Sequence, residues 1–225
     1  MALTTLIFDL DGTLIDSALD LRTACNKLLQ SKGRREISLV ETKKFVGNGA
    51  AKLVERAFRA TGDPLSEADI ELLTDAFLDF YDGHEADETV TYPDVMEVLA
   101  GLKQKGYRLA LCTNKPHQPT INLSKDLKLA DFFEVIIGGD EVLCKKPDAE
   151  MLFLALEKMG VSKNEAIMIG DSPNDIGAAQ NAAMKSIAVS YGYCKIPVEE
   201  MGADRVIDKM ADLPNALDHL TSLYD

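Results

Sequence analysis

The sequence contains no tryptophan, only three histidines and only four cysteines among its 225 residues. The histidines lie far apart and the cysteines form no CxxC pair, so neither residue type indicates a zinc site. Cysteines scattered in this way are typical of reduced thiols in an intracellular protein, not of a disulfide-bonded secreted one. The four cysteines are Cys25, Cys112, Cys144 and Cys194.

Positive charge is also scarce, because 24 lysines and arginines stand against 37 aspartates and glutamates, for a formal net charge of −13. Nucleic acids and anionic membranes require a basic surface, so neither is expected as a partner. A small phosphorylated metabolite in a local positive pocket is compatible with this charge. We see no signal peptide and no apolar run long enough to cross a bilayer, and we expect a cytoplasmic protein, monomeric or homodimeric.

The hydrophobic pattern divides the chain into two kinds of segment. A short apolar strand at 6–8 is followed by residues 16–88, where apolar residues recur at helical spacing and no convincing strand is visible. Serines at 38 and 66 have the position of helix N-caps, and glycines at 33 and 83 that of helix ends. This pattern predicts four helices, at 17–33, 38–47, around 53–58 and 66–83.

The remainder of the chain alternates helices with unbroken apolar strands. The predicted strands are 107–112, 135–137, 166–169 and 186–189, and the predicted helices are 94–105, 118–127, 148–159 and 174–183. Such alternation indicates a parallel sheet buried on both faces. The sequence therefore predicts an α/β fold, with a doubly wound Rossmann-like parallel sheet core (1–15 and 89–225). An all-helical cap (16–88) is inserted after the first strand, over the sheet edge where such folds bind ligands.

Four polar clusters follow predicted strands, and parallel strands bring their carboxyl ends to one edge of a sheet. Each cluster alone has an ordinary explanation as a turn, a helix cap, a solvated lysine pair or a helix start. Their shared location favours a common site. The clusters are Asp9-Leu10-Asp11-Gly12-Thr13, Cys112-Thr113-Asn114-Lys115, Lys145-Lys146-Pro147 and Gly170-Asp171-Ser172-Pro173-Asn174-Asp175.

These residue types suit phosphoryl chemistry. Asp9, Asp11 and Asp171 supply hard oxygen ligands of the kind that Mg²⁺ prefers. Thr113 and Lys146 could then hold the oxygens of a phosphoryl group and offset its charge. One carboxylate can act as the nucleophile while its neighbour moves the proton.

The same residues resemble the motifs of the haloacid dehalogenase (HAD) superfamily of phosphatases. Residues 9–13 match its DxDGT motif, Thr113 its strand-end Thr or Ser, Lys146 its Lys before proline, and 170–175 its GDxxxD motif. Within the superfamily, segments such as Val46-Gly47-Asn48-Gly49 and Cys112-Thr113-Asn114-Lys115-Pro116 are similar to phosphoglycolate phosphatases. Ala149 departs from that pattern, since relatives usually have proline there, and this should affect only the start of the next helix.

The resemblance implies a role for each matching residue. Asp9 would attack phosphorus and become phosphorylated, while Asp11 would protonate the leaving alcohol and later activate water. Mg²⁺ would be held by the carboxylates of Asp9 and Asp171 and by the backbone carbonyl of Asp11. The presence of Asp11 argues against dehalogenation, which needs no acid there.

The remaining implied roles concern the groups around the metal and the phosphate. Asp175 would orient the metal's ligands, directly or through water. Thr113, Asn114 and Lys146 would bind the phosphoryl group, and Lys146 would also pair with Asp9.

The expected cap offers a candidate for substrate selection in the turn Gly47-Asn48-Gly49. Glycine lets the backbone approach a ligand closely, so this turn could present N–H groups to an anionic substrate tail, with Lys43, Lys44 and Lys52 flanking it. The alternative is an ordinary connection between two helices with solvated lysines.

The predicted reaction is Mg²⁺-dependent hydrolysis of 2-phosphoglycolate to glycolate and phosphate. Other enzymes with the same core stay open as alternatives: a pyrophosphatase, a sugar or nucleotide phosphatase, a phosphosugar mutase, or a phosphonatase with a cap lysine as Schiff base. A module that only senses phosphate or Mg²⁺ is the non-catalytic alternative.

Overall fold

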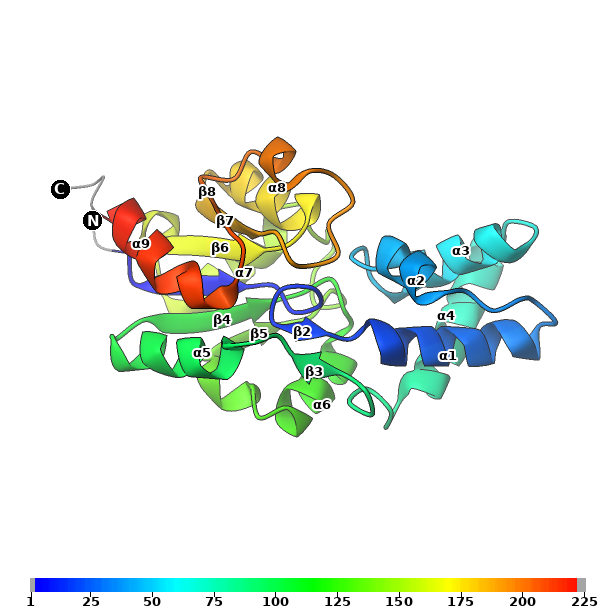
Figure 1. Cartoon of the computed structure of the whole chain (residues 1–225). Helices are drawn as coiled ribbons and strands as arrows, with labels where there is room; N and C mark the ends of the chain where they lie inside the picture. The colour runs from blue at the N-terminus through cyan, green and yellow to red at the C-terminus, as the bar shows by residue number, and fades with distance from the viewer. Residues whose placement is uncertain (1–2, 222–225) are drawn as a thin grey trace.

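The computed structural model describes residues 3–221, and within this range six parallel strands form one sheet in the order β5-β4-β1-β6-β7-β8 (Figure 1). The central strand β1 has β4 on one side and β6 on the other, with Phe8 opposite both Leu111 and Ile169. Strands β4 and β5 therefore extend the sheet on one side of β1, and β6, β7 and β8 extend it on the other. Such sheets bind ligands at the point where the strand order reverses in this way. The strands are β1 (Thr5–Phe8), β4 (Arg108–Cys112), β5 (Val135–Ile137), β6 (Ala166–Gly170), β7 (Lys185–Val189) and β8 (Arg205–Ile207).

Helices cover both faces of this sheet, which confirms the doubly wound α/β core. One hydrophobic cluster joins the sheet to α5 (Val95–Gln104), α6 (His117–Asp126) and α9 (Leu213–Thr221). A second cluster joins the opposite face to α7 (Glu150–Met159) and α8 (Pro173–Ala182). Strands β1 and β6 are buried throughout, as the continuous apolar runs predict. Short 3₁₀ helices, η1 (Ala130–Phe132), η2 (Lys163–Glu165), η3 (Val198–Met201) and η4 (Met210–Asp212), complete the core.

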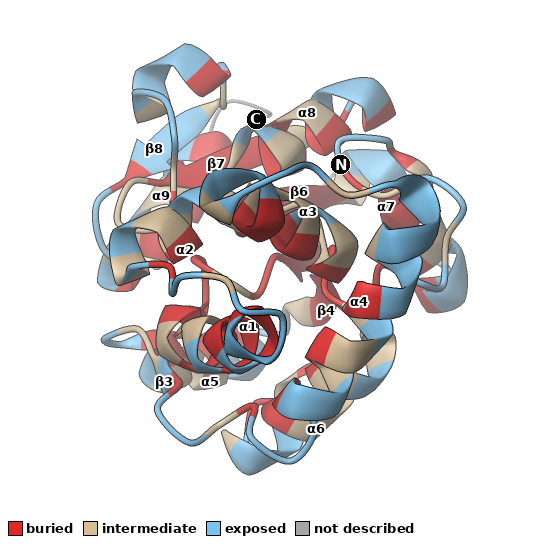
Figure 2. Ribbon diagram, turned by 90° about the vertical axis from the view of Figure 1, so that its right-hand side faces the viewer, coloured by how far each residue is buried: buried red, intermediate tan, exposed pale blue. Residues whose placement is uncertain are grey.

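Helices α1 to α4 lie together beside the carboxyl edge of the sheet and share a separate hydrophobic cluster (Figure 1). Their exposed residues face outward and their buried residues gather between the helices (Figure 2). Ser38 and Glu41 form the predicted capping box, and Ser66 accepts a hydrogen bond from the Asp69 N–H. The helices are α1 (Ala18–Ser31), α2 (Leu39–Phe45), α3 (Ala50–Thr61) and α4 (Glu67–Tyr81).

The hydrophobic pattern does not reveal two short strands where the helical segment meets the core. β2 (Ile15–Asp16) pairs with the antiparallel β3 (Val90–Thr91), so both connections between α1–α4 and the core run side by side. The expectation that 16–88 contains no strand is therefore wrong at Asp16, because two residues are too few to show an alternating pattern. The boundaries 1–15, 16–88 and 89–225 stay a prediction.

The buried carboxylate of Asp20 ties these two connections together. It accepts hydrogen bonds from the backbone N–H groups of Glu88 (3.0 Å) and Thr89 (2.8 Å) and from the Thr89 hydroxyl (2.7 Å). Asp20 belongs to α1, so the start of the helical segment is fixed to its end.

Other departures from the sequence prediction are small. The pattern reveals neither β8 nor α9, and α7 begins at Glu150, two residues later than expected. Among residues 3–221, no helix combines the length and the apolar character needed to cross a lipid bilayer.

Candidate active site

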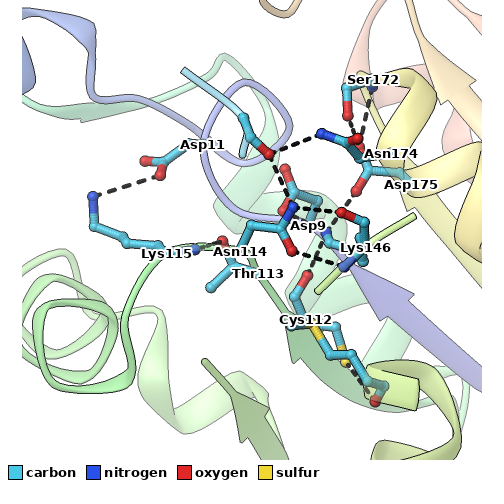
Figure 3. Close-up of polar contacts among 12 residues, drawn as sticks. Asp9, Asp11, Cys112, Thr113, Asn114, Lys115, Lys146, Ser172, Asn174 and Asp175 are labelled. Atoms are coloured by element: carbon cyan, nitrogen blue, oxygen red, sulfur yellow. Dashed lines mark hydrogen bonds and ion pairs between the residues drawn. The ribbon is translucent and has the colours of Figure 1, made fainter. Parts of the chain in front are cut away.

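The four sequence clusters meet at the carboxyl edge of the sheet, as predicted (Figure 3). Asp9 directly follows β1, Thr113 follows β4 and Asp171 follows β6. Lys146 comes from the loop after β5, and Asp175 lies in the first turn of α8. Together with Asp11 and Asn114, all of these residues line one cavity between the sheet edge and helices α1, α3 and α4.

Lys146 lies at the centre of the buried polar network. Its Nζ donates to Asp9 Oδ1 (2.8 Å), to Asp175 Oδ1 (2.5 Å) and to the Cys112 carbonyl oxygen (2.7 Å). These three bonds use all three ammonium hydrogens. Burial alone would lower the pKa of Lys146, but the charges of Asp175 and Asp9 outweigh it and raise the pKa. The lysine is therefore permanently charged and paired with Asp9.

Three buried carboxylates, those of Asp9, Asp171 and Asp175, have oxygens within 4.8 Å of one another. Burial raises the pKa of Asp9 to about 7, against the attraction of Lys146, and burial together with the neighbouring Asp175 raises that of Asp171 well above its ordinary value. The single ammonium of Lys146 therefore does not balance the cluster. A dry set of hard oxygen donors that lacks positive charge fits a divalent cation such as Mg²⁺.

The hydrogen bonds of these carboxylates distinguish two kinds of oxygen. Asp175 uses both of its oxygens, because Oδ1 accepts from Lys146 and Oδ2 from the N–H (3.1 Å) and hydroxyl (2.6 Å) of Ser172. Asp171 Oδ2 accepts from the Tyr193 N–H at 2.6 Å. Asp9 Oδ2 and Asp171 Oδ1 receive no hydrogen bond from any residue in 3–221, so they are the oxygens left for a cation.

Glycines make the close packing around Asp171 possible. A Cβ at Gly12 would lie 2.3 Å from Asp171 Oδ2, and one at Gly192 would lie 2.3 Å from Asp171 Cβ. Gly12 also has φ +95°, which other residues rarely adopt. The Gly in the Asp9–Thr13 motif is therefore required by both space and backbone conformation.

Asp11 stands apart from the three-carboxylate cluster. Its Oδ1 accepts a 2.5 Å hydrogen bond from the Ser17 hydroxyl, and its Oδ2 lies 3.5 Å from Lys115 Nζ. The side chain is 11% exposed, so the carboxyl group can reach the cavity. This separation suits a group that exchanges protons, while Asp9 is held against Lys146.

Donors for a phosphoryl group lie beside Asp9. Thr113 Oγ1 accepts from the Lys115 N–H (3.2 Å), which leaves its hydroxyl hydrogen available. The backbone N–H groups of Asp11 and Asn114 make no hydrogen bond within the described residues. The Asn114 side chain, by contrast, is fully used: its Nδ2 donates to the carbonyls of Gly47 (3.0 Å) and Lys146 (2.9 Å), and its Oδ1 accepts from the Lys146 N–H (3.0 Å).

The turn at Gly47, Asn48 and Gly49 docks on the core through the Gly47 carbonyl oxygen and the Asn48 side chain. The Gly47 carbonyl accepts from the side chains of Asn114 (3.0 Å) and Asn174 (2.9 Å), and Asn48 Nδ2 donates to Asn174 Oδ1 (3.2 Å). Gly47 and Gly49 line the cavity, and Gly49 has no room for a side chain, since its Cβ would lie 2.9 Å from the Asn114 carbonyl oxygen. Contact of this turn with substrate stays a prediction.

The lysines that flank the turn do not line the cavity. Lys43 pairs with Asp16 at 2.8 Å, and Lys52 with Glu55 at 2.6 Å. Lys44 is exposed. The idea that these lysines attract a substrate carboxylate into the cavity is therefore not supported by their positions.

Two further polar residues of the cavity are Lys115 and Tyr81. Lys115 belongs to the sequence cluster that ends at 115 but has no predicted role there, and Tyr81 is not identified from the sequence. Tyr81 is the last residue of α4, and its ring stacks on that of Phe77. From the sequence alone, such a tyrosine cannot be distinguished from an aromatic residue of the hydrophobic core. The other lining residues from α1, α3, α4 and the α2–α3 turn are apolar: Leu21, Val46, Ala50, Leu53, Phe77 and Leu78. The empty volume, which includes space open to solvent, is about 580 Å³.

Comparisons with known proteins agree with this geometry. A family profile described as haloacid dehalogenase-like hydrolase matches residues 6–189. Similar curated proteins include phosphoglycolate phosphatases of Caulobacter vibrioides (41% identical over 94% of this chain and 90% of that one) and Agrobacterium fabrum (40% identical over 94% and 91%). The crystal structure of a predicted phosphoglycolate phosphatase from Haemophilus somnus superposes with a TM-score of 0.89, at 29% identity over 95% of this chain and 97% of that one.

Proposed function

The chain belongs to the haloacid dehalogenase-like hydrolase family, and we propose that it is a Mg²⁺-dependent phosphatase that hydrolyses 2-phosphoglycolate to glycolate and phosphate. The observation that carries this proposal is the pair Asp9 and Asp11 on one cavity. Asp9 is buried against Lys146, and Asp11 is held separately by Ser17. Two carboxylates in such different surroundings suit a nucleophile and a proton-transfer group.

In the first half of the reaction, a carboxylate oxygen of Asp9 forms a bond to phosphorus as the bond from phosphorus to the leaving oxygen breaks. Asp11 gives its proton to that oxygen, and glycolate leaves. In the second half, Asp11 takes a proton from water as the water oxygen attacks the phosphorus of the acyl phosphate on Asp9. The Asp9–phosphorus bond breaks, phosphate leaves, and Asp11 is protonated again.

The metal would be held by the carboxylates of Asp9 and Asp171 and by the backbone carbonyl of Asp11. Bound there, Mg²⁺ would offset the negative charge of the phosphoryl oxygens. Asp175 would act as a positioning residue, because both of its oxygens are already bound to Lys146 and Ser172. Asp175 thereby holds the lysine that faces Asp9.

The phosphoryl group would be bound by the Thr113 hydroxyl and by the unpaired backbone N–H groups of Asp11 and Asn114. Lys146 would contribute its charge, and the Asn114 side chain would hold the Lys146 loop and the Gly47 carbonyl in place. Residues 16–88 would form a cap whose apolar side chains close the cavity and exclude water, which favours transfer to Asp9. The free thiols of all four cysteines support a reducing compartment, and we propose the cytoplasm.

A panel of phosphate monoesters tests this proposal. Phosphate release is measured from 2-phosphoglycolate, p-nitrophenyl phosphate and a phosphosugar, each with Mg²⁺ and with EDTA. The proposal expects Mg²⁺-dependent release with a strong preference for 2-phosphoglycolate. Release from the other esters alone would reject the substrate, and conversion of a phosphosugar to its isomer without free phosphate would indicate a mutase.

A further inference from the structure

The substrate class proposed above carries a second anionic group, and the cavity contains few residues that could bind one. The side chains that line it from α1, α3 and the α2–α3 turn are apolar. Within residues 3–221, two cationic side chains line it, those of Lys146 and Lys115. The three hydrogens of Lys146 are already bound to Asp9, Asp175 and the Cys112 carbonyl. Lys115 is therefore the cation of this cavity with capacity for a ligand.

The surroundings of Lys115 leave two donors unsatisfied. Its Nζ donates to the Tyr81 hydroxyl oxygen at 2.9 Å and lies 3.5 Å from Asp11 Oδ2, at the outer limit of a hydrogen bond. No further acceptor among residues 3–221 is bonded to the ammonium, and the Tyr81 hydroxyl hydrogen has no acceptor there. The Lys115 side chain is 4% exposed, so bulk water does not replace these partners. Two free hydrogens, one from each residue, match the two oxygens of a carboxylate.

Both groups also hold the protonation state that a carboxylate requires. Lys115 carries the positive charge that a lysine ordinarily has at neutral pH. Burial raises the pKa of Tyr81 to about 12, so its hydroxyl keeps its hydrogen at neutral pH. A buried ammonium and a buried phenol make strong hydrogen bonds to an anion.

Lys115 also lies on the appropriate side of the reacting atoms. Asp11, which would protonate the leaving oxygen, separates Lys115 from the Asp9, Lys146 and Asp175 cluster (Figure 3). The atoms attached to the leaving oxygen would therefore lie next to Asp11, whose Oδ2 is 3.5 Å from Lys115 Nζ. In 2-phosphoglycolate a single CH₂ group separates that oxygen from the carboxylate.

We propose that Lys115 and the Tyr81 hydroxyl bind the carboxylate of the leaving group and so select phosphorylated hydroxy acids over neutral phosphate esters. This inference rests on the proposed function, since it names the residues that recognise the proposed substrate. It assigns selection to one lysine of the core and one tyrosine of α4, in place of the lysines beside the Gly47–Gly49 turn.

The test compares kcat/KM for 2-phosphoglycolate with that for its neutral amide, 2-phosphoglycolamide. Loss of a charge-assisted hydrogen bond costs about 1.5–3 kcal/mol, so Lys115→Met should lower kcat/KM for the carboxylate roughly 10- to 100-fold. The value for the amide should fall less, because any loss that acts through the contact with Asp11 is common to both substrates, so the carboxylate-to-amide ratio reports recognition of the carboxylate. Tyr81→Phe should lower the carboxylate-to-amide ratio by a smaller factor.

Lys145→Met is the matched control, because Lys145 is a neighbouring lysine near Gly49 that does not line the cavity. This variant should keep the wild-type ratio of kcat/KM for the carboxylate to kcat/KM for the amide. Lys115→Gln serves as a second variant if Lys115→Met does not fold, as judged by circular dichroism and thermal melting.

The outcomes separate this inference from the proposed function. A wild-type enzyme that does not prefer the carboxylate would reject the proposed substrate. A wild-type preference that survives in both Lys115 variants would overturn the inference alone. Equal losses for both substrates would also overturn it, since they would show that Lys115 acts through Asp11.

Discussion

The hydroxyl of Ser17 donates a 2.5 Å hydrogen bond to the Asp11 carboxylate. Ser17 immediately precedes α1, and its backbone N–H and that of Ala18 donate to the Tyr193 hydroxyl at 2.8 and 3.1 Å. The N–H of Tyr193 in turn donates to Asp171 at 2.6 Å. The start of the helical segment, the proposed proton-transfer group and the acidic cluster therefore share one network, and the position of α1 sets the orientation of Asp11.

Ser17→Ala tests this link. General acid–base catalysis contributes roughly 10²- to 10⁴-fold in rate, and we expect loss of one orienting hydrogen bond to lower kcat about tenfold with little change in KM. Steady-state kinetics measures the change. Ser31→Ala is the control, since the Ser31 hydroxyl bonds only the Leu28 carbonyl of its own helix. Equal kcat values for the wild type and Ser17→Ala would show that Asp11 does not depend on this hydroxyl.

Tyr193→Phe tests how firmly the network fixes the helical segment. The hydroxyl accepts two backbone N–H groups and donates to Asp16 at 2.7 Å, so its removal leaves buried donors without an acceptor. We expect the free energy of unfolding to fall by about 1–3 kcal/mol, as measured by urea denaturation. Tyr191→Phe, which loses one bond to the Thr13 carbonyl, should lose less. The reverse order would contradict the assigned network.

Asp9→Asn should abolish turnover without loss of the fold. The isosteric amide removes the nucleophile, so we expect kcat to fall on the order of 10⁴-fold or more. Because burial already disfavours the Asp9 charge, the thermal midpoint of the metal-free variant should equal or exceed that of the wild type. A variant with wild-type turnover would exclude Asp9 as the nucleophile.

Mg²⁺ should stabilise the protein more at high pH than at low pH. Burial raises the pKa of Asp9 from 3.8 to about 7, so the folded metal-free chain binds more protons than the unfolded chain in this window. The free energy of unfolding of the metal-free protein therefore falls as the pH rises between these two pKa values. Mg²⁺ competes with protons for the Asp9 carboxylate, so it binds more tightly as the pH rises. At a Mg²⁺ concentration of about 100 Kd, binding contributes about 2.7 kcal/mol, or roughly 5–10 °C in the thermal midpoint.

Differential scanning fluorimetry at about pH 5 and about pH 8 measures this shift, with the window taken from proton linkage. The Mg²⁺-induced rise should be larger at the higher pH and absent in Asp171→Asn. An equal rise at both pH values, or an unchanged rise in Asp171→Asn, would contradict the assignment of the acidic cluster to the metal.

The core of the fold and of the site was predictable because both depend on local signals. Continuous apolar strands such as 166–169 indicate a parallel sheet, and parallel strands bring their ends to one edge, so Asp9, Thr113 and Asp171 could be grouped from their positions alone. The pairing of Lys146 with Asp9 was expected from the resemblance to the haloacid dehalogenase motifs, and the structure shows it at 2.8 Å. These inferences need no knowledge of how side chains pack.

The remaining features depend on contacts between distant segments. The β2–β3 pair has two residues per strand, and Tyr193 reaches Ser17 across 176 positions of the chain. Tyr81 resembles a core aromatic until α4 is placed over the cavity. The engagement of Asn114 with Gly47 likewise follows from docking of the helical segment, which the sequence pattern of either partner does not encode.

The most direct test of the account is to look for phosphate on Asp9. A single turnover of 2-phosphoglycolate labelled at phosphorus is quenched in acid, and the labelled peptide is identified by mass spectrometry. If Asp9 is the nucleophile, label appears on Asp9 and decays as phosphate is released, and none appears in Asp9→Asn. Release of phosphate at the wild-type rate without label on Asp9 would contradict it.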